Sequence, residues 1–338
     1  MSARVRAALK FLIGLAVLVA VVWWVVPGPA ERQALLARLR PDPLWLLLGF
    51  AANFVASVVT SARWQLMTEE AMGGTRLPYV AYFHSLVLTR VLGQVSSTLV
   101  MDLVGRGVAL RSAGSRHGLG HAVTQAIIER IFDIVLPLMM LAWAIAAWQG
   151  GWHAGLAAGS FALVCLAFAG LAAVILAPLT RLALRIYAAL RRLRARRRTS
   201  STSTSTPPDV VAAAELAAGP IPLPRGLAVR IGVLSLLRYL AVLAMFWTLA
   251  LGIGVDITAL QIAAAAPIGQ IAGMAGFTPG ALGIQEAGWL GALTWVGLDA
   301  PAIGLFVICQ RLISTAYFSV LSLLSWLILR RTRAPAPP

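Results

Sequence analysis

Long apolar runs constrain this chain more than any other feature. Windows of about 20 residues, the length that an α-helix needs to cross a bilayer, lie near 9–26, 44–62, 120–148, 154–177, 229–252 and 302–329. Weaker windows lie at 79–99, 259–275 and 281–298. Only 12% of the residues are charged, about half the share of a soluble domain. We therefore expect an all-α polytopic membrane protein of about six to eight transmembrane helices, with additional re-entrant or broken helices.

The whole chain, 1–338, is expected to form a single integral-membrane domain. The membrane bundle would cover about 10–330, interrupted by a loop over 191–226 that is rich in Arg and then in Ser and Thr. Residues 330–338 would form a short tail. The basic start and apolar run of 1–26 could also be a cleaved signal peptide, but a first helix that remains as an anchor is the interpretation we favour.

The net charge of +16 has a clear distribution along the chain. Basic residues gather at the N-terminus, in the 178–228 segment and at the C-terminal tail, whereas the turns near 149–153 and 253–258 have no Arg or Lys. By the positive-inside rule both termini and the 191–226 loop are cytoplasmic. We interpret this charge as a topology signal, with no nucleic acid as partner, and we expect a multi-pass protein of a bacterial inner membrane.

The segment 267–287, PIGQIAGMAGFTPGALGIQEA, is apolar but broken by prolines and glycines. Backbone freed by such breaks must be buried in protein or line a wet cavity, and broken helices of this kind carry substrate sites in transporters. Thr278, Pro279 and Gly280 would open a helix whose free N–H groups favour an anion. Glu286 follows and would pair with an arginine or carry a proton.

The segment 79–99 is too polar to face lipid, since it holds His84, Arg90 and Gln94. We interpret it as a re-entrant helix pair or an inward-facing helix. If it does not cross the membrane, every basic cluster falls on one side. Together with 259–298, which either crosses twice or forms a re-entrant hairpin, it hints at two inverted halves, although the residues show no clear repeat.

Several charges lie inside or at the edges of the apolar windows. Glu129 and Asp133 share one helix face, and Arg130 lies beside them. They would form either an interhelix charge network or a headgroup or proton site. The arginines at 63, 90, 130 and 311 are the candidates to bind an anionic substrate, and the carboxylates at 129, 133 and 286 would balance them or couple transport to protons. Arg238 lies near the start of its window and could snorkel to the surface.

No catalytic motif, nucleotide-binding loop or metal-ligand spacing stands out, so we expect no catalytic residues, no metal and no cofactor. The two cysteines, Cys165 and Cys309, lie in apolar windows and are interpreted as small buried side chains.

Four elements together resemble a known family: Arg-Trp at 63–64, D-x-x-G-R-G-x-x-L-R at 102–111, E-R-x-x-D at 129–133 and T-P-G-A-L-G-I-Q-E-A at 278–287. The chain looks like the flippase-like transmembrane domain shared with lysylphosphatidylglycerol synthases, over about 10–330. The usual family form has Gly-Gly after the proline, where this chain has Gly280-Ala281, a change that we expect to be tolerated. In two-domain relatives a C-terminal domain makes the aminoacylated lipid; this chain ends at Pro338, so we expect that transferase activity to be lacking.

The resemblance implies movement of a lipid or a lipid-linked saccharide between leaflets, as part of building the cell envelope. Our leading hypothesis is therefore a lipid transporter, not an enzyme, whose cargo bears a phosphate. A small-solute or ion carrier would use the same broken helices. A membrane-embedded transferase acting on lipid-linked substrates is a further alternative, but it usually needs a metal-binding loop outside the membrane. The identity of the lipid, the direction, the coupling ion and the oligomeric state are left open by the sequence.

Overall fold

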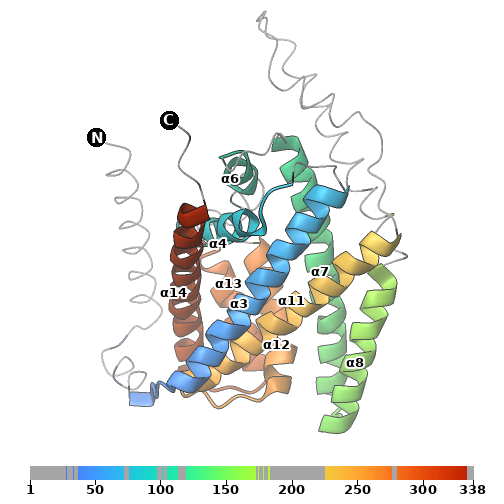
Figure 1. Cartoon of the computed structure of the whole chain (residues 1–338). Coiled ribbons are helices and arrows are strands. Elements are labelled where there is room, and N and C mark those ends of the chain that lie inside the picture. Colours follow the sequence, from blue (N-terminus) through green and yellow to red (C-terminus); the bar gives the residue numbers. More distant parts are fainter. Residues whose placement is uncertain are drawn as a thin grey trace, which may run out of the picture.

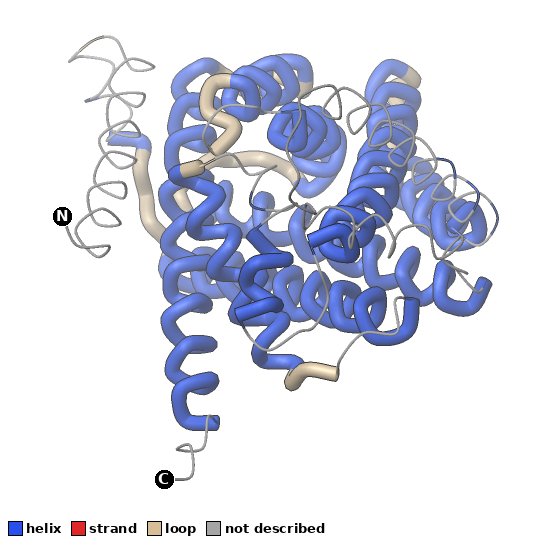
Figure 2. Tube along the Cα trace, turned by 90° about the horizontal axis from the view of Figure 1, so that it is seen from above, coloured by secondary structure: helices blue, strands red, loops and turns tan. Residues whose placement is uncertain are grey.

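The computed structural model describes residues 28, 33, 37–71, 76–96, 101, 105–112, 119–172, 174, 178, 182, 225–275 and 280–332. Within these ranges the regular elements are helical (Figure 2). They are α3 (Pro43–Leu66), the π-helix η1 (Met67–Ala71), α4 (Tyr79–Val95), α6 (Arg106–Ser112), α7 (Leu119–Gln149), α8 (Ala154–Leu171), α11 (Arg225–Gly252), α12 (Ala259–Ala275), α13 (Ile284–Trp295) and α14 (Ala300–Thr332). The expected all-α class is confirmed.

In the described ranges four helices are long and apolar enough to cross a membrane: Pro43–Glu70, Ile128–Gln149, Arg225–Gly252 and Ala300–Arg331. They correspond to four of the six strong apolar windows. The window at 154–177 contains α8, which belongs to the shorter apolar helices, and the window at 9–26 lies outside the described residues. Large apolar side chains such as Leu163 and Leu166, 67% and 69% exposed, lie on the outer surface of the bundle, as expected for a surface that meets lipid.

Local sequence sets where several helices begin. Pro43 opens α3, and the Asp42 carboxylate accepts a hydrogen bond from the Leu44 N–H at 2.9 Å. Before α12, Thr258 and Gln261 form a reciprocal capping box, in which each side chain accepts the other residue's backbone N–H. These caps set the residues at which α3 and α12 begin. The Asp42 N–H also donates to the Gly252 carbonyl, so α3 begins beside the end of α11. The start of α12 follows the end of α11 closely in the sequence and lies at the same end of the bundle.

The segment 259–298 forms a hairpin that enters and returns on one side. α11 ends beside the start of α3 (Figure 1), and Asp299, just before α14, pairs with Arg38 on that same side. Between them α12 and α13 run into the bundle and back, packed closely where Gly288 meets Ala272. With 12 residues, α13 is only about 18 Å long, too short to cross a hydrocarbon core of about 30 Å.

The described part of the segment 79–99 forms the helix α4, from Tyr79 to Val95. Tyr82, Leu86 and Val87 on it are buried, which agrees with an inward-facing helix. Residues 97–100 lie outside the described residues. The chain then continues through α6 to α7, which begins at the end of the bundle where α3 ends (Figure 1), so α4 and α6 lie between two crossings as α12 and α13 do.

The helices form two inverted halves. α12 repeats α4 180 residues later, at its first residue (79 and 259) and at its last (95 and 275). α14 begins 181 residues after α7, at 300 and 119. In Figure 1 α3 and α11 run in opposite directions, as do α7 and α14. α4 packs on α14 just as α12 packs on α7, so each half inserts its short helix against the long helix of the other half.

Candidate functional site

A cavity of about 200 Å³ lies in the bundle where the two halves meet. Helices α3, α4, α7, α11, α12 and α14 all contribute to its wall. Its described lining includes four arginines, Arg90, Arg130, Arg238 and Arg311, and no Asp or Glu. A cluster of guanidinium groups inside an apolar bundle is costly unless anions offset it. The cavity is therefore suited to a negatively charged ligand.

The two halves supply equivalent positions to this cavity. Arg130 on α7 and Arg311 on α14 are 181 residues apart, the same spacing that relates the starts of their helices. Gly93 on α4 and Gly273 on α12 are 180 apart, again the spacing of their helices. The inverted repeat therefore places matching residues on the wall of one cavity.

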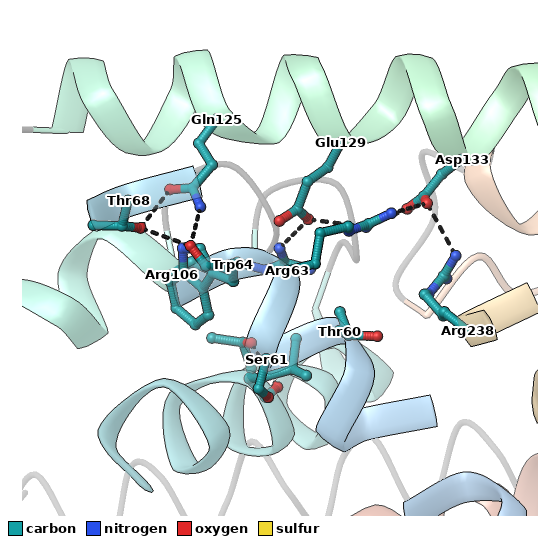
Figure 3. Close-up of polar contacts among 12 residues, drawn as sticks. Thr60, Ser61, Arg63, Trp64, Thr68, Arg106, Gln125, Glu129, Asp133 and Arg238 are labelled. Atoms are coloured by element: carbon teal, nitrogen blue, oxygen red, sulfur yellow. Dashed lines mark hydrogen bonds and ion pairs between the residues drawn. The ribbon is translucent and has the colours of Figure 1, made fainter. Parts of the chain in front are cut away.

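Behind one wall lies a network of buried ion pairs (Figure 3). Arg63 on α3, 1% exposed, donates to an Asp133 oxygen on α7 at 2.7 Å. Its other terminal nitrogen lies 3.4 Å from a Glu129 oxygen. Arg238 on α11 also pairs with Asp133, at 3.0 Å, and Arg106 on α6 pairs with Glu129 at 2.5 Å. Among the described residues, the two carboxylates thus connect four helices through three guanidinium groups.

A second charge cluster lies at the broken hairpin. The Arg311 guanidinium pairs with the Glu286 carboxylate on α13 and donates to the Gly280 carbonyl oxygen. Glu286 also accepts the Gly283 N–H at 2.7 Å, so this helix-start donor is satisfied within the protein. Gly280 N–H in turn donates to the Ser96 carbonyl oxygen at 2.8 Å. The break in the second half therefore touches the end of α4 in the first half.

Backbone geometry explains the residue types in this turn. Gly280 has φ +59°, and a Cβ there would clash with the Arg311 guanidinium and lie 2.7 Å from the Gln94 carbonyl oxygen. Only glycine fits such a crowded left-handed position. Ala281 also has a positive φ, +57°, a backbone conformation that glycine adopts more easily than alanine. Alanine accepts that conformation at a cost of about 1 kcal/mol.

The structure brings together part of the expected site. Arg90, Arg130, Arg311 and Gly280 line the cavity. Arg63 is instead enclosed in the ion-pair network with Glu129 and Asp133. Thr278 and Pro279 lie outside the described residues.

Sequence reasoning missed Arg238 as a site residue. It lines the cavity and is held by Asp133 instead of extending toward the membrane surface. The signal that could have found it is its depth in a span, because a half-buried cation there needs an anion from a neighbouring helix. The amide and hydroxyl groups of Asn53, Gln270 and Ser314 on the cavity wall were also missed. Within the described ranges, no three His, Cys, Asp or Glu side chains gather as a metal site would require.

Comparison with known proteins gave one match. The model of a family described as "Lysylphosphatidylglycerol synthase TM region" matches residues 11–322, which is most of the chain. Searches of curated proteins and of solved structures returned no match. The chain therefore belongs to the lysylphosphatidylglycerol synthase TM region family, which indicates a multi-pass membrane protein with a function related to membrane lipids.

Proposed function

We propose that this protein translocates a phosphate-bearing lipid, or a lipid-linked glycan, between the leaflets of the bacterial inner membrane. The headgroup would occupy the cavity, and the acyl or prenyl tails would stay in the bilayer. The observation that carries the proposal is the cavity itself: four arginines lie on its wall and no carboxylate is among its described lining residues. Guanidinium groups match phosphate oxygens in charge and in their paired geometry.

The charge balance around the cavity supports an anionic cargo. Six arginines lie on its wall or in the two charge clusters beside it: Arg63, Arg90, Arg106, Arg130, Arg238 and Arg311. The ion pairs between described residues supply three carboxylates, those of Glu129, Asp133 and Glu286. Among the described residues of this region the arginines therefore outnumber the carboxylates, and a phosphate headgroup would offset part of their charge. Asp133 and Glu286 would hold Arg238 and Arg311 in place while their remaining N–H groups bind the cargo.

The contact between the broken hairpin and α4 supports a transport role. Arg311 lines the cavity and is tied to Glu286 and to the Gly280 carbonyl. An anion that competes with Glu286 for Arg311 would loosen the turn whose Gly280 N–H bonds to Ser96. Binding of the cargo would thus act on the point where the two halves touch.

Basic residues at one end of the bundle support the orientation. Arg225 and Arg230 lie in the first two turns of α11, and Arg330 and Arg331 lie in the last turn of α14. In Figure 1 α11 begins, and α14 ends, in the upper part of the bundle. We propose that this end faces the cytoplasm. At the opposite end Arg38 pairs with Asp299, which offsets its charge.

The test is a reconstituted flipping assay with the full chain. Phospholipids labelled on an acyl tail, with native headgroups, are placed in proteoliposomes, and a membrane-impermeant reductant quenches the label in the outer leaflet. If the protein flips the lipid, quenching extends to the inner-leaflet pool. The Arg130→Gln and Arg311→Gln double variant should slow this by about tenfold or more, because charge-assisted hydrogen bonds to phosphate are lost.

Two controls make the result specific. Arg230→Gln removes an exposed arginine of the same helical bundle that pairs with Glu70, and neither residue is among the described lining of the cavity. This variant should flip lipid at the normal rate. Uptake of soluble glycerol phosphate is measured in parallel. If none of the phosphate lipids is flipped and soluble glycerol phosphate is taken up, the protein is a small-solute carrier and the proposal is wrong.

A further inference from the structure

We infer that the seam between α13 and α14 is a lateral portal through which a lipid headgroup enters the cavity from the bilayer, and that the Glu286–Arg311 ion pair keeps it closed. This rests on the proposed function and adds the route by which its cargo reaches the cavity. Three observations carry it: the cavity wall is one helix thick at this seam, α13 packs less extensively on α14 than on α12, and the arginine of the ion pair lines the cavity.

The wall of the cavity is thin where α13 begins. Gln285 in the first turn of α13 lines the cavity, whereas the residue before it, Ile284, is 38% exposed. On α14 Arg311 lines the cavity, and the residue after it, Leu312, is 43% exposed. Both exposed side chains are apolar, as expected for a surface that meets lipid. If the first turn of α13 moves away from α14, the cavity is therefore connected directly with the bilayer.

The middle of α13 is anchored in the core. A Cβ atom on Gly269 of α12 would lie 2.4 Å from the Trp289 ring, so Trp289 rests directly on the α12 backbone. The Trp289 side chain is buried, and the centre of its ring lies 4.8 Å from that of Phe246 and 5.0 Å from that of Phe306. An opening confined to the first turn of α13, which precedes Trp289, leaves this packing intact.

The Glu286–Arg311 pair joins the first turn of α13 to α14 across the seam. Because Arg311 also lines the cavity, a phosphate there can take the place of the Glu286 carboxylate on the guanidinium group. The released carboxylate keeps the Gly283 N–H as a hydrogen-bond donor, at 2.7 Å, and lies where the helix dipole favours a negative charge. The exchange leaves neither charge without a partner, so the cargo itself opens the portal.

The first half has an ion pair of reversed polarity at the equivalent place. Arg106 at the start of α6 lies 180 residues before Glu286, the spacing that relates α4 to α12, and it pairs with Glu129 on α7. Neither Arg106 nor Glu129 is among the described lining of the cavity. A phosphate in the cavity therefore meets the arginine of the α13–α14 pair and not that of the α6–α7 pair, which places the portal at the α13–α14 seam.

The test measures whether a lipid reaches the cavity through this seam. The full chain carries Gln285→Cys on the cavity wall, together with Cys165→Ala and Cys309→Ala, and is placed in nanodiscs. The introduced thiol reacts with a phospholipid that bears a maleimide on its headgroup and, in parallel, with a small water-soluble maleimide. The ratio of the two rates is compared, because a change in thiol ionisation alters both rates equally. Adding Glu286→Gln should raise the ratio of the lipid rate to the soluble rate by about tenfold, since a charge-assisted bond across the seam is lost.

Three variants separate opening of the seam from loosening of the whole protein. Glu129→Gln removes the carboxylate of the equivalent pair in the first half; it should lower the melting temperature but leave the rate ratio within about twofold. Ile284→Trp, added to Glu286→Gln, places a bulky ring at the mouth of the seam and should return the ratio to the value with Glu286 intact. Leu163→Trp, at an exposed position on α8, is its matched control and should leave the ratio raised.

The outcomes distinguish the portal from the proposed function. A rate ratio that is unchanged by Glu286→Gln, that rises as much in Glu129→Gln, or that is not lowered by Ile284→Trp overturns the portal. If the reconstituted protein still flips lipid in that case, the proposed function stands and the cargo enters elsewhere. Labelling by the soluble maleimide alone, together with no flipping of any phosphate lipid, refutes the proposed function as well.

Discussion

The two inverted halves share a framework but differ in how they hold charge. In the first half α7 carries Glu129, Arg130 and Asp133. In the second half α14 carries Gln310, Arg311 and Ser314 at the same relative positions, 181 residues later. The arginine is common to both, but both carboxylates of the first half are replaced by neutral polar groups. The first half thus fixes its helices with buried ion pairs, and the second half leaves its polar groups facing the cavity.

This difference predicts a structural role for the ion-pair network of the first half and a role in transport for the Arg311–Glu286 pair of the second half. Asp133 and Glu129 bind guanidinium groups from α3, α6 and α11 and are themselves buried. Arg311 has one carboxylate partner, and that partner comes from the short helix α13 after the break. Changing the first network should therefore harm stability, whereas changing the second should harm transport.

The largest expected effect comes from Asp133→Asn. It leaves the guanidinium groups of Arg63 and Arg238 without their buried carboxylate partner, which typically costs about 3–5 kcal/mol. Thermal unfolding of the purified protein in detergent measures it. Glu70→Gln, which breaks the exposed pair with Arg230, is the matched control and should change the unfolding free energy by less than about 1 kcal/mol. Equal effects of the two substitutions would refute an anchoring role.

Gly280→Ala should disrupt the contact between the halves. Its Cβ would clash with Arg311 and crowd the Gln94 carbonyl, so we expect a loss of about 2–3 kcal/mol in stability and of flipping activity. Gly283→Ala is the control, because Gly283 also has a positive φ, +84°, but nothing lies within 4 Å of its Cβ position. If backbone strain alone matters, the two variants should lose similar stability and activity. If the contact with Arg311 and Gln94 matters, Gly280→Ala should lose more than Gly283→Ala.

Gln310→Glu introduces a carboxylate into the second half at the position equivalent to Glu129 in the first half. The side chain lines the cavity beside Arg311, so the new negative charge should compete with a phosphate headgroup. We expect flipping to slow by about tenfold, with the melting temperature within a few degrees of the parent. The isosteric Gln310→Met variant keeps the cavity free of negative charge and serves as its control. Undiminished flipping in the glutamate variant would show that the neutral groups of α14 are unimportant for cargo binding.

Ala281→Gly should have the smallest effect. It relieves a left-handed alanine, worth about 1 kcal/mol, but loses a buried methyl group of similar value. The unfolding free energy should therefore change by less than about 1 kcal/mol, and flipping should be unaffected. A clear loss of activity would indicate that the methyl group, and not only the backbone, contributes to the turn.

The sequence predicted the parts of this protein that depend on local composition. Four of the strong apolar windows coincide with the helices long enough to span, and three of the four arginines that it nominated line the cavity. It could not predict pairings such as Arg63 with Asp133, or Gly280 with Ser96, because these residues are far apart along the chain. The repeat was also not visible in the sequence. Glu129 and Asp133 of the first half correspond to Gln310 and Ser314 of the second, so the two halves differ in charge at equivalent positions. These positions are recognised only when the helices α7 and α14 are aligned.

The register that relates α4 to α12 and α7 to α14 has a consequence for direction. If the protein moves lipid as proposed, a cargo held between two such copies would meet an equivalent scaffold from either leaflet. The symmetric fold alone would then favour neither direction of transport. A preferred direction would come from the difference between α7, which carries Glu129 and Asp133, and α14, which carries Gln310 and Ser314, together with consumption of the lipid in one leaflet.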